Sequence, residues 1–87
     1  MASKTIARTL RFHGDFIKEI YDAVGDRPFT ARRLATLGVD IPPGVSLRRY
    51  HYAGIFTLVG RTADSHKAIW RLSPSVLEYY AAQGATA

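Results

Sequence analysis

Cysteine is absent from this sequence of 87 residues. Its absence excludes disulfide bonds, thiolate metal ligands and thiol nucleophiles, so the fold must be stabilised by packing. The three histidines, His13, His51 and His66, lack the short spacing within a helix or loop that a zinc site uses. We therefore expect neither a metal nor any other cofactor.

Long apolar runs are also missing. No stretch approaches the roughly 18 apolar residues that a membrane-spanning helix needs. The opening residues, MASKTIARTLRFHGDF, lack the continuous apolar core of a secretory signal. These absences predict an intracellular, cytoplasmic protein, associated with the nucleoid if the chain is prokaryotic, and no membrane partner.

Groups suited to catalysis are few. The chain has no glycine-rich phosphate loop and no convincing pair of carboxylates. Asp64, Ser65 and His66 are of the types found in catalytic triads, but three consecutive loop positions cannot adopt the buried geometry of a triad. We therefore expect no catalytic residues and no enzymatic activity.

The composition that remains is that of an ordinary folded domain. Hydrophobic residues make up 47% and charged residues 22% of the chain. We predict a single domain over residues 1–87, with a core from about residue 5 to residue 83 and frayed ends. A domain of this size buries only about 60% of the surface of its unfolded chain, so no large enclosed site is expected.

The formal net charge of +5 is concentrated in the middle of the chain. Residues 27–73 carry eight basic and two acidic side chains, whereas residues 1–26 carry four of each sign. A concentrated basic segment is typical of a protein that binds a polyanion, either a nucleic acid or an anionic membrane surface. The alternative is a basic face that only maintains solubility.

Apolar periodicity predicts four helices. The first runs from about residue 5 to Val24, the second follows an N-cap at Thr30, and the third runs from Val45 or Ser46 to Gly54. A short last helix opens at Ser73 and Pro74. The residues expected to face the core are, helix by helix, Phe12, Phe16, Ile17, Ile20, Tyr21 and Val24; Leu34, Ala35 and Leu37; Leu47, Tyr50 and Ala53; and Val76, Leu77, Tyr80 and Ala81.

Two further segments predict a β-hairpin. Residues 55–60 and 67–73 are rich in β-branched and aromatic side chains and flank the polar stretch RTADSH. Alternation places Trp70 and Leu72 toward the core, with Ile69 and Arg71 on the opposite face. The segment VDIPPGVS is expected to connect the second and third helices, because two successive prolines disfavour a helix.

The segments FTARRLATLG, VSLRRYHYAGIFTLVGR and AIWRLSP resemble the winged helix-turn-helix domains of transcriptional regulators. The resemblance covers roughly residues 12 to 80. It implies an α+β, mainly α fold with a three-helix core, a two-stranded β-hairpin as the wing and a short C-terminal helix. It also implies that the third helix recognises double-stranded DNA.

Two features depart from that family pattern. The connection before the third helix is longer than the three or four residues of a tight helix-turn-helix. Tyr50 occupies a core position where leucine is usual. The longer connection changes how the third helix would meet DNA, so the docking cannot be copied from the family.

The predicted DNA-binding residues fall into two groups. Arginine can donate two hydrogen bonds to guanine, and the third helix presents outward polar side chains that suit base reading in the major groove; these are Ser46, Arg48, Arg49 and His51, with Tyr52 left unexplained by packing. Basic residues before this helix and on the hairpin suit phosphate contacts. They are Arg32, Arg33, Arg61, His66, Lys67 and Arg71.

The sequence thus predicts a DNA-binding winged-helix protein, either a transcriptional regulator or a chromatin-associated factor. Two other functions stay open. Winged helices also serve as protein–protein adaptors, in which case the basic face would meet an acidic protein, and basic winged helices also bind RNA or associate with ribosomes. The sequence is equally compatible with a monomer and with a homodimer that reads paired half-sites.

Overall fold

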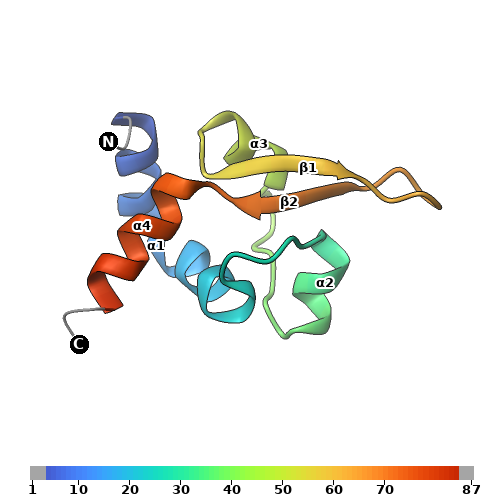
Figure 1. The fold of residues 1–87 in the computed structure, drawn as a ribbon, viewed down its shortest axis with the longest axis horizontal. Coiled ribbons are helices and arrows are strands. Elements are labelled where there is room, and N and C mark those ends of the chain that lie inside the picture. The colour runs from blue at the N-terminus through green and yellow to red at the C-terminus, as the bar shows by residue number, and fades with distance from the viewer. Residues whose placement is uncertain (1–3, 85–87) are drawn as a thin grey trace.

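The computed structural model describes residues 4–84, which form four helices and one antiparallel hairpin (Figure 1). The order confirms the predicted succession of elements. The elements are α1 (Lys4–Val24), α2 (Ala31–Thr36), α3 (Leu47–Tyr52), β1 (Phe56–Arg61), β2 (Ala68–Leu72) and α4 (Pro74–Gly84). The predicted frayed ends lie outside the described residues, apart from Lys4 and Gly84, which belong to helices. No helix in the described range is long and apolar enough to cross a membrane.

The hairpin is held to the helices by a third backbone segment. Phe56 pairs with Leu72 and Leu58 with Trp70, and the register shifts between Leu58 and Gly60 as in a β-bulge. Phe29, in the loop between α1 and α2, forms an isolated bridge with Trp70 through N–H···O bonds of 2.8 and 2.7 Å. Residues that are far apart in the sequence are thereby joined at the outer edge of β2.

The core lies between the helices and the inner face of the hairpin. Ile17, Ile20 and Leu34 are fully buried from the helices, and Phe56 and Leu72 from the strands. Aromatic rings contact each other at its centre: Phe29 meets Phe56 edge to face at 5.1 Å, Phe56 meets Trp70 at 6.1 Å, and Phe56 meets Tyr50 at 5.6 Å. The burial of Tyr50, Trp70 and Leu72 confirms their predicted positions.

A kink divides α1 and corrects the prediction for Phe12. His13 has non-helical dihedral angles, φ −125° and ψ 17°, so the two halves of α1 do not share one apolar stripe. Phe12 was expected to face the core but is 69% exposed, whereas Ile6 and Leu10 of the first half are buried. The Tyr80 hydroxyl of α4 donates a hydrogen bond of 3.3 Å to the Gly14 carbonyl beside the kink.

Three other inward predictions are wrong. Ala35, Leu37 and Ala81 are exposed. α2 has only six residues and ends at Thr36, with Leu37 as its C-cap, so only Leu34 of this helix is buried. The predicted N-cap of α2 is confirmed, because Thr30 Oγ1 accepts a hydrogen bond of 3.1 Å from the Arg33 amide. α3 ends at Tyr52, two residues before the predicted Gly54.

Removing the hydroxyl groups of two buried tyrosines should affect stability differently. Tyr80→Phe loses the hydrogen bond to Gly14 and should lower the free energy of unfolding by about 1 kcal/mol. Tyr50→Phe removes a buried hydroxyl that has no partner among the described residues, so it should leave stability unchanged or raise it by about 1 kcal/mol. Urea denaturation measures both changes, with Tyr79→Phe, an exposed ring on α4, as control. A larger loss for Tyr50→Phe would contradict this assignment.

The pH dependence of stability gives a second test of Tyr80. Burial raises the pKa of Tyr80 to about 12, with smaller effects from the charges of Tyr79, Asp15 and Asp22. The folded state therefore holds the phenol proton more tightly than the unfolded chain does, and this stabilisation is complete below about pH 10 and is lost as the pH rises toward 12. Thermal unfolding of Tyr80→Phe should show a shallower loss of stability over this range than the wild type. Equal slopes would contradict the raised pKa.

Candidate nucleic-acid interface

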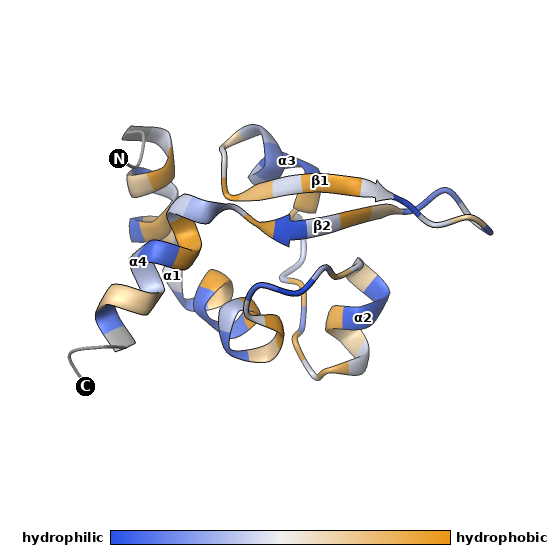
Figure 2. Ribbon diagram, in the orientation of Figure 1, coloured by the Kyte–Doolittle hydropathy of each residue, from blue (hydrophilic) through white to orange (hydrophobic). Residues whose placement is uncertain are grey.

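A groove lies where the first residues of α2, the first residues of α3 and the end of the hairpin meet. It has a volume of about 840 Å³. Four predicted site residues line it: Arg32 from α2, Ser46 and Arg48 from the start of α3, and Lys67 from the hairpin. Figure 2 shows hydrophilic residues along α3 and along the loop that joins the strands. The structure therefore brings together residues from three elements that are well separated in the sequence.

The groove is positively charged. Arg32, Arg48 and Lys67 are exposed, and Asp64 is the acidic residue among its lining side chains. Within residues 4–84 the only salt bridge joins Lys18 Nζ and Asp22 Oδ1 of α1, so none of the three cations forms an ion pair with a carboxylate of these residues. Unpaired cations on three sides of an open groove attract an anionic chain more strongly than dispersed surface charges do.

α3 presents a narrow exposed face beside this groove. Leu47 and Tyr50 are buried in the core, whereas Arg48, Arg49 and Tyr52 are exposed. Arg48 and Tyr52 are four residues apart and therefore lie on the same face of the helix. Arg48 lines the groove, but Arg49 projects about 100° further around the helix axis and does not.

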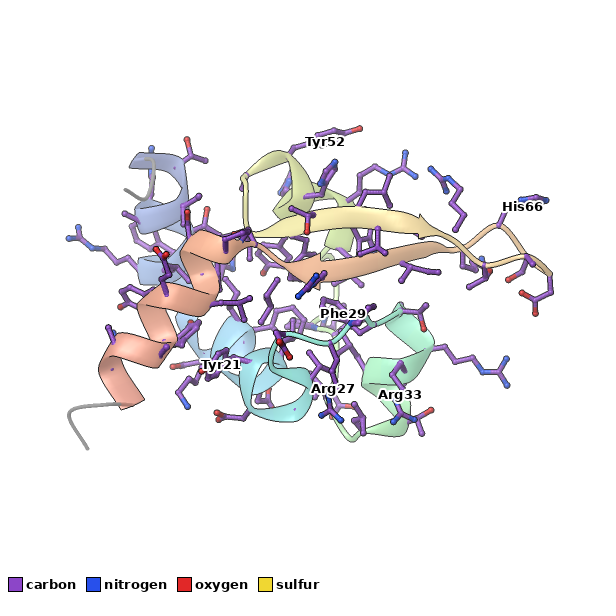
Figure 3. The ribbon with its side chains drawn as sticks, viewed as in Figure 1. Tyr21, Arg27, Phe29, Arg33, Tyr52 and His66 are labelled. Atoms are coloured by element: carbon purple, nitrogen blue, oxygen red, sulfur yellow. The ribbon has the colours of Figure 1, made fainter. Side chains whose placement is uncertain are left out.

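Tyr52 and Arg33 lie on opposite sides of the molecule. Tyr52 is 76% exposed, and in Figure 3 it points away from α2. Arg33 lies on the side of α2 that faces away from α3 and does not line the groove (Figure 3). Arg33, predicted to contact phosphates, therefore lies on a different surface from Arg48, which lines the groove.

Two further predicted arginines make backbone hydrogen bonds. Arg71 Nε donates to the Asp26 carbonyl at 2.7 Å and so ties β2 to the loop between α1 and α2. Arg61 Nη1 donates to the His66 carbonyl at 3.2 Å and braces the end of the hairpin. Neither residue lines the groove. Both guanidinium groups support the fold around the groove, which the sequence did not indicate.

The end of the hairpin is closed by Thr62. Its Oγ1 accepts a hydrogen bond of 3.1 Å from the Lys67 amide, and its own amide donates to the Lys67 carbonyl at 2.9 Å. His66 adopts a positive φ of 53° and lies exposed at the end of the hairpin, outside the groove (Figure 3). Thr62 thus positions Lys67. Sequence reasoning missed this residue, although a threonine that opens a polar turn is known to bond within that turn.

His51, predicted to read bases from α3, makes a hydrogen bond within the molecule. His51 is half-buried, its ring packs 5.3 Å from that of Trp70, and its Nδ1 lies 2.9 Å from the Phe56 carbonyl oxygen. A carbonyl only accepts hydrogen bonds, so Nδ1 must carry the proton. In neutral His51 the other nitrogen, Nε2, is then an acceptor, which suits the amino group of adenine or cytosine rather than guanine.

No group of three histidine, aspartate or glutamate side chains in the described part of the chain could hold a metal ion. No family model matches the chain, and neither does any curated protein or solved structure. The roles assigned to the residues of the groove therefore rest on their geometry and charge.

Replacing His51 and replacing Arg48 should change the stability of the protein by different amounts. His51→Ala removes the hydrogen bond to Phe56 and the packing on Trp70, so it should lower the free energy of unfolding by about 1 to 2 kcal/mol. Arg48→Ala removes an exposed side chain and should change it by less than about 0.5 kcal/mol. Urea denaturation of both variants is the measurement. A stability loss for Arg48→Ala as large as that for His51→Ala would show that Arg48 supports the fold.

Proposed function

We propose that this chain is a winged-helix protein that binds double-stranded DNA, with α3 in the major groove and the hairpin on the backbone. The observation that carries the proposal is the groove lined by Arg32, Arg48 and Lys67, none of which forms an ion pair with a carboxylate of residues 4–84. A regulator of transcription or a chromatin-associated protein would use such a surface.

The arrangement of the elements supports this proposal. Three helices, a hairpin and a closing helix follow one another in the order expected for a winged helix. The connection between α2 and α3 covers residues 37–46 and is longer than a tight turn, so α3 is positioned mainly by its own buried face. Leu47 and Tyr50 anchor that face, and the exposed face is left available.

The length of α3 limits how much sequence it can read. Six helical residues span about 9 Å, which corresponds to roughly three base pairs at 3.4 Å each. Arg48 and Arg49 are the side chains suited to guanine, and Arg32 and Lys67 would hold phosphates at the edge of the groove. We therefore expect phosphate contacts to supply most of the affinity and α3 a modest sequence preference.

Salt titrations of duplex binding test these roles. Lys67→Ala should weaken binding equally for all sequences and reduce the slope of log K against log salt by about one unit, because one phosphate contact is lost. Arg48→Ala and Arg49→Ala should each cost about 1 to 3 kcal/mol on the preferred sequence and relax the preference. Fluorescence anisotropy with duplexes selected from a random pool measures both effects. Lys18→Ala, which removes a cation paired with Asp22 on α1, is the matched control.

Other outcomes would replace the proposal. Tighter binding to structured RNA than to duplex in direct competition would indicate an RNA-binding protein. Absence of any duplex binding at low salt would favour a protein adaptor with an acidic partner. Unchanged affinity for the Arg48 and Lys67 variants would show that another face binds the DNA.

A further inference from the structure

We infer that the first half of α1 is a second contact for the DNA backbone, on the opposite side of α3 from the groove. This inference rests on the proposed function. The contact consists of Arg8, Arg11 and Phe12, here called the α1 patch. None of these residues was among the predicted site residues, because the charges of residues 1–26 cancel in the sequence.

The kink at His13 separates charges that cancel along the chain. The residues of α1 before the kink include Lys4, Arg8 and Arg11 and no acidic residue. The residues after it contain Asp15, Glu19 and Asp22 together with Lys18, whose charge is paired with Asp22 at 2.7 Å. α1 is therefore basic before the kink and acidic after it.

The α1 patch has the chemistry of a nucleic-acid contact. Arg8 and Phe12 are four residues apart and Arg8 and Arg11 three apart, so all three share one face of the helix. With Ala7 they surround a shallow hollow of about 570 Å³. Both arginines are exposed and form no ion pair with any described residue, and Phe12 is 69% exposed. Guanidinium groups bind phosphates, and an exposed aromatic ring beside them packs on sugars or bases.

The half of α1 that carries the α1 patch packs next to the end of α3. Ile6, on the buried side of the same helical half, packs so closely on the turn after α3 that a Cβ atom on Gly54 would lie 3.0 Å from Ile6 Cγ1. Arg11 and Phe12 also share a hollow with Pro42, in the connection that leads to α3. The half of α1 that carries the patch therefore packs beside the end of α3, with its buried side toward that helix and the patch on its exposed side.

The dimensions of the molecule allow one duplex to reach both contacts. In Figure 1 the first half of α1 and the hairpin lie at opposite ends of the long axis, with α3 between them. The long axis is 41 Å, which equals about 12 base pairs at 3.4 Å each, slightly more than one turn of B-form DNA. The groove at the start of α3 and the patch on the helical half that packs near its end would thus hold phosphates on either side of the base contacts.

The chemistry of the patch disfavours a second copy of this chain as its occupant. In a two-fold symmetric contact the same patch would face itself, which would bring two pairs of arginines together. Like charges in contact repel, whereas a phosphate backbone neutralises both arginines. We therefore assign the patch to DNA.

Salt titration of a duplex of about 20 base pairs tests the inference. The double variant Arg8→Ala/Arg11→Ala should reduce the slope of log K against log salt by about two units and weaken binding about tenfold at low salt, because two phosphate contacts are lost. Arg11→Ala alone should cost about one unit, whereas Lys18→Ala, which removes a cation from the second half of α1, should cost none. Circular dichroism verifies folding, which exposed arginines without partners should not affect.

The salt titration of the Arg8→Ala/Arg11→Ala variant is compared with that of a second double variant, Arg48→Ala/Lys67→Ala, which removes two cations from the groove. Wild-type binding that is weakened by both double variants, with additive losses in slope when they are combined, supports the inference. Binding weakened by the groove variant alone overturns the α1 patch and leaves the proposed function intact. Absence of duplex binding by the wild type overturns the proposed function and the inference with it.

A photo-cross-linking experiment locates the contact directly. With p-benzoylphenylalanine in place of Phe12, irradiation should cross-link the protein to labelled duplex. The same group in place of Tyr79, an exposed ring on α4, should not. Cross-links from position 12 to a second protein chain, or equal yields on DNA from both positions, would overturn the assignment.

Discussion

The two backbone hydrogen bonds between Phe29 and Trp70 determine how the hairpin sits relative to the helices. They join the loop before α2 to β2, and the Trp70 ring lies against Phe56 and His51. His51 belongs to α3 and Phe56 to β1, so Trp70 contacts α3 and β1 through its indole ring and the loop before α2 through its backbone. Without this contact Arg32, Arg48 and Lys67 would sit on elements free to move apart.

The sequence was sufficient to predict helix starts and the burial of individual side chains, because these depend on residues close to one another along the chain. Thr30 begins α2, Pro74 begins α4, and the burial of Tyr50 and Trp70 follows from their spacing. The kink in α1 could not be predicted in this way, because Phe12 and Phe16 fit one continuous stripe until the backbone departs at His13. The bridge between Phe29 and Trp70 joins segments that are distant in the sequence, so no periodic pattern of apolar residues predicts it.

The candidate site was predictable by residue type but not by arrangement. Arg32, Arg48 and Lys67 do converge, whereas Arg71 is held by the Asp26 carbonyl and His51 by the Phe56 carbonyl. The partners of Arg71 and His51 are backbone carbonyl groups. Every residue carries such a group, so the sequence does not indicate which one a side chain will contact. Summing charge over residues 1–26 likewise hid the basic half of α1, because the cations that precede the kink are cancelled in the sum by the acidic residues that follow it.

The bulge in β1 has a consequence for how the molecule behaves at high concentration. β2 is covered on its outer side by Phe29, but the outer edge of β1 has no neighbouring strand among the described residues. Leu58 and Val59 on this strand are exposed, a combination that would favour the addition of a strand from another molecule. The irregular register between Leu58 and Gly60 interrupts the even row of amide and carbonyl groups that an incoming strand requires. This irregularity should therefore help keep the free strand from seeding aggregation.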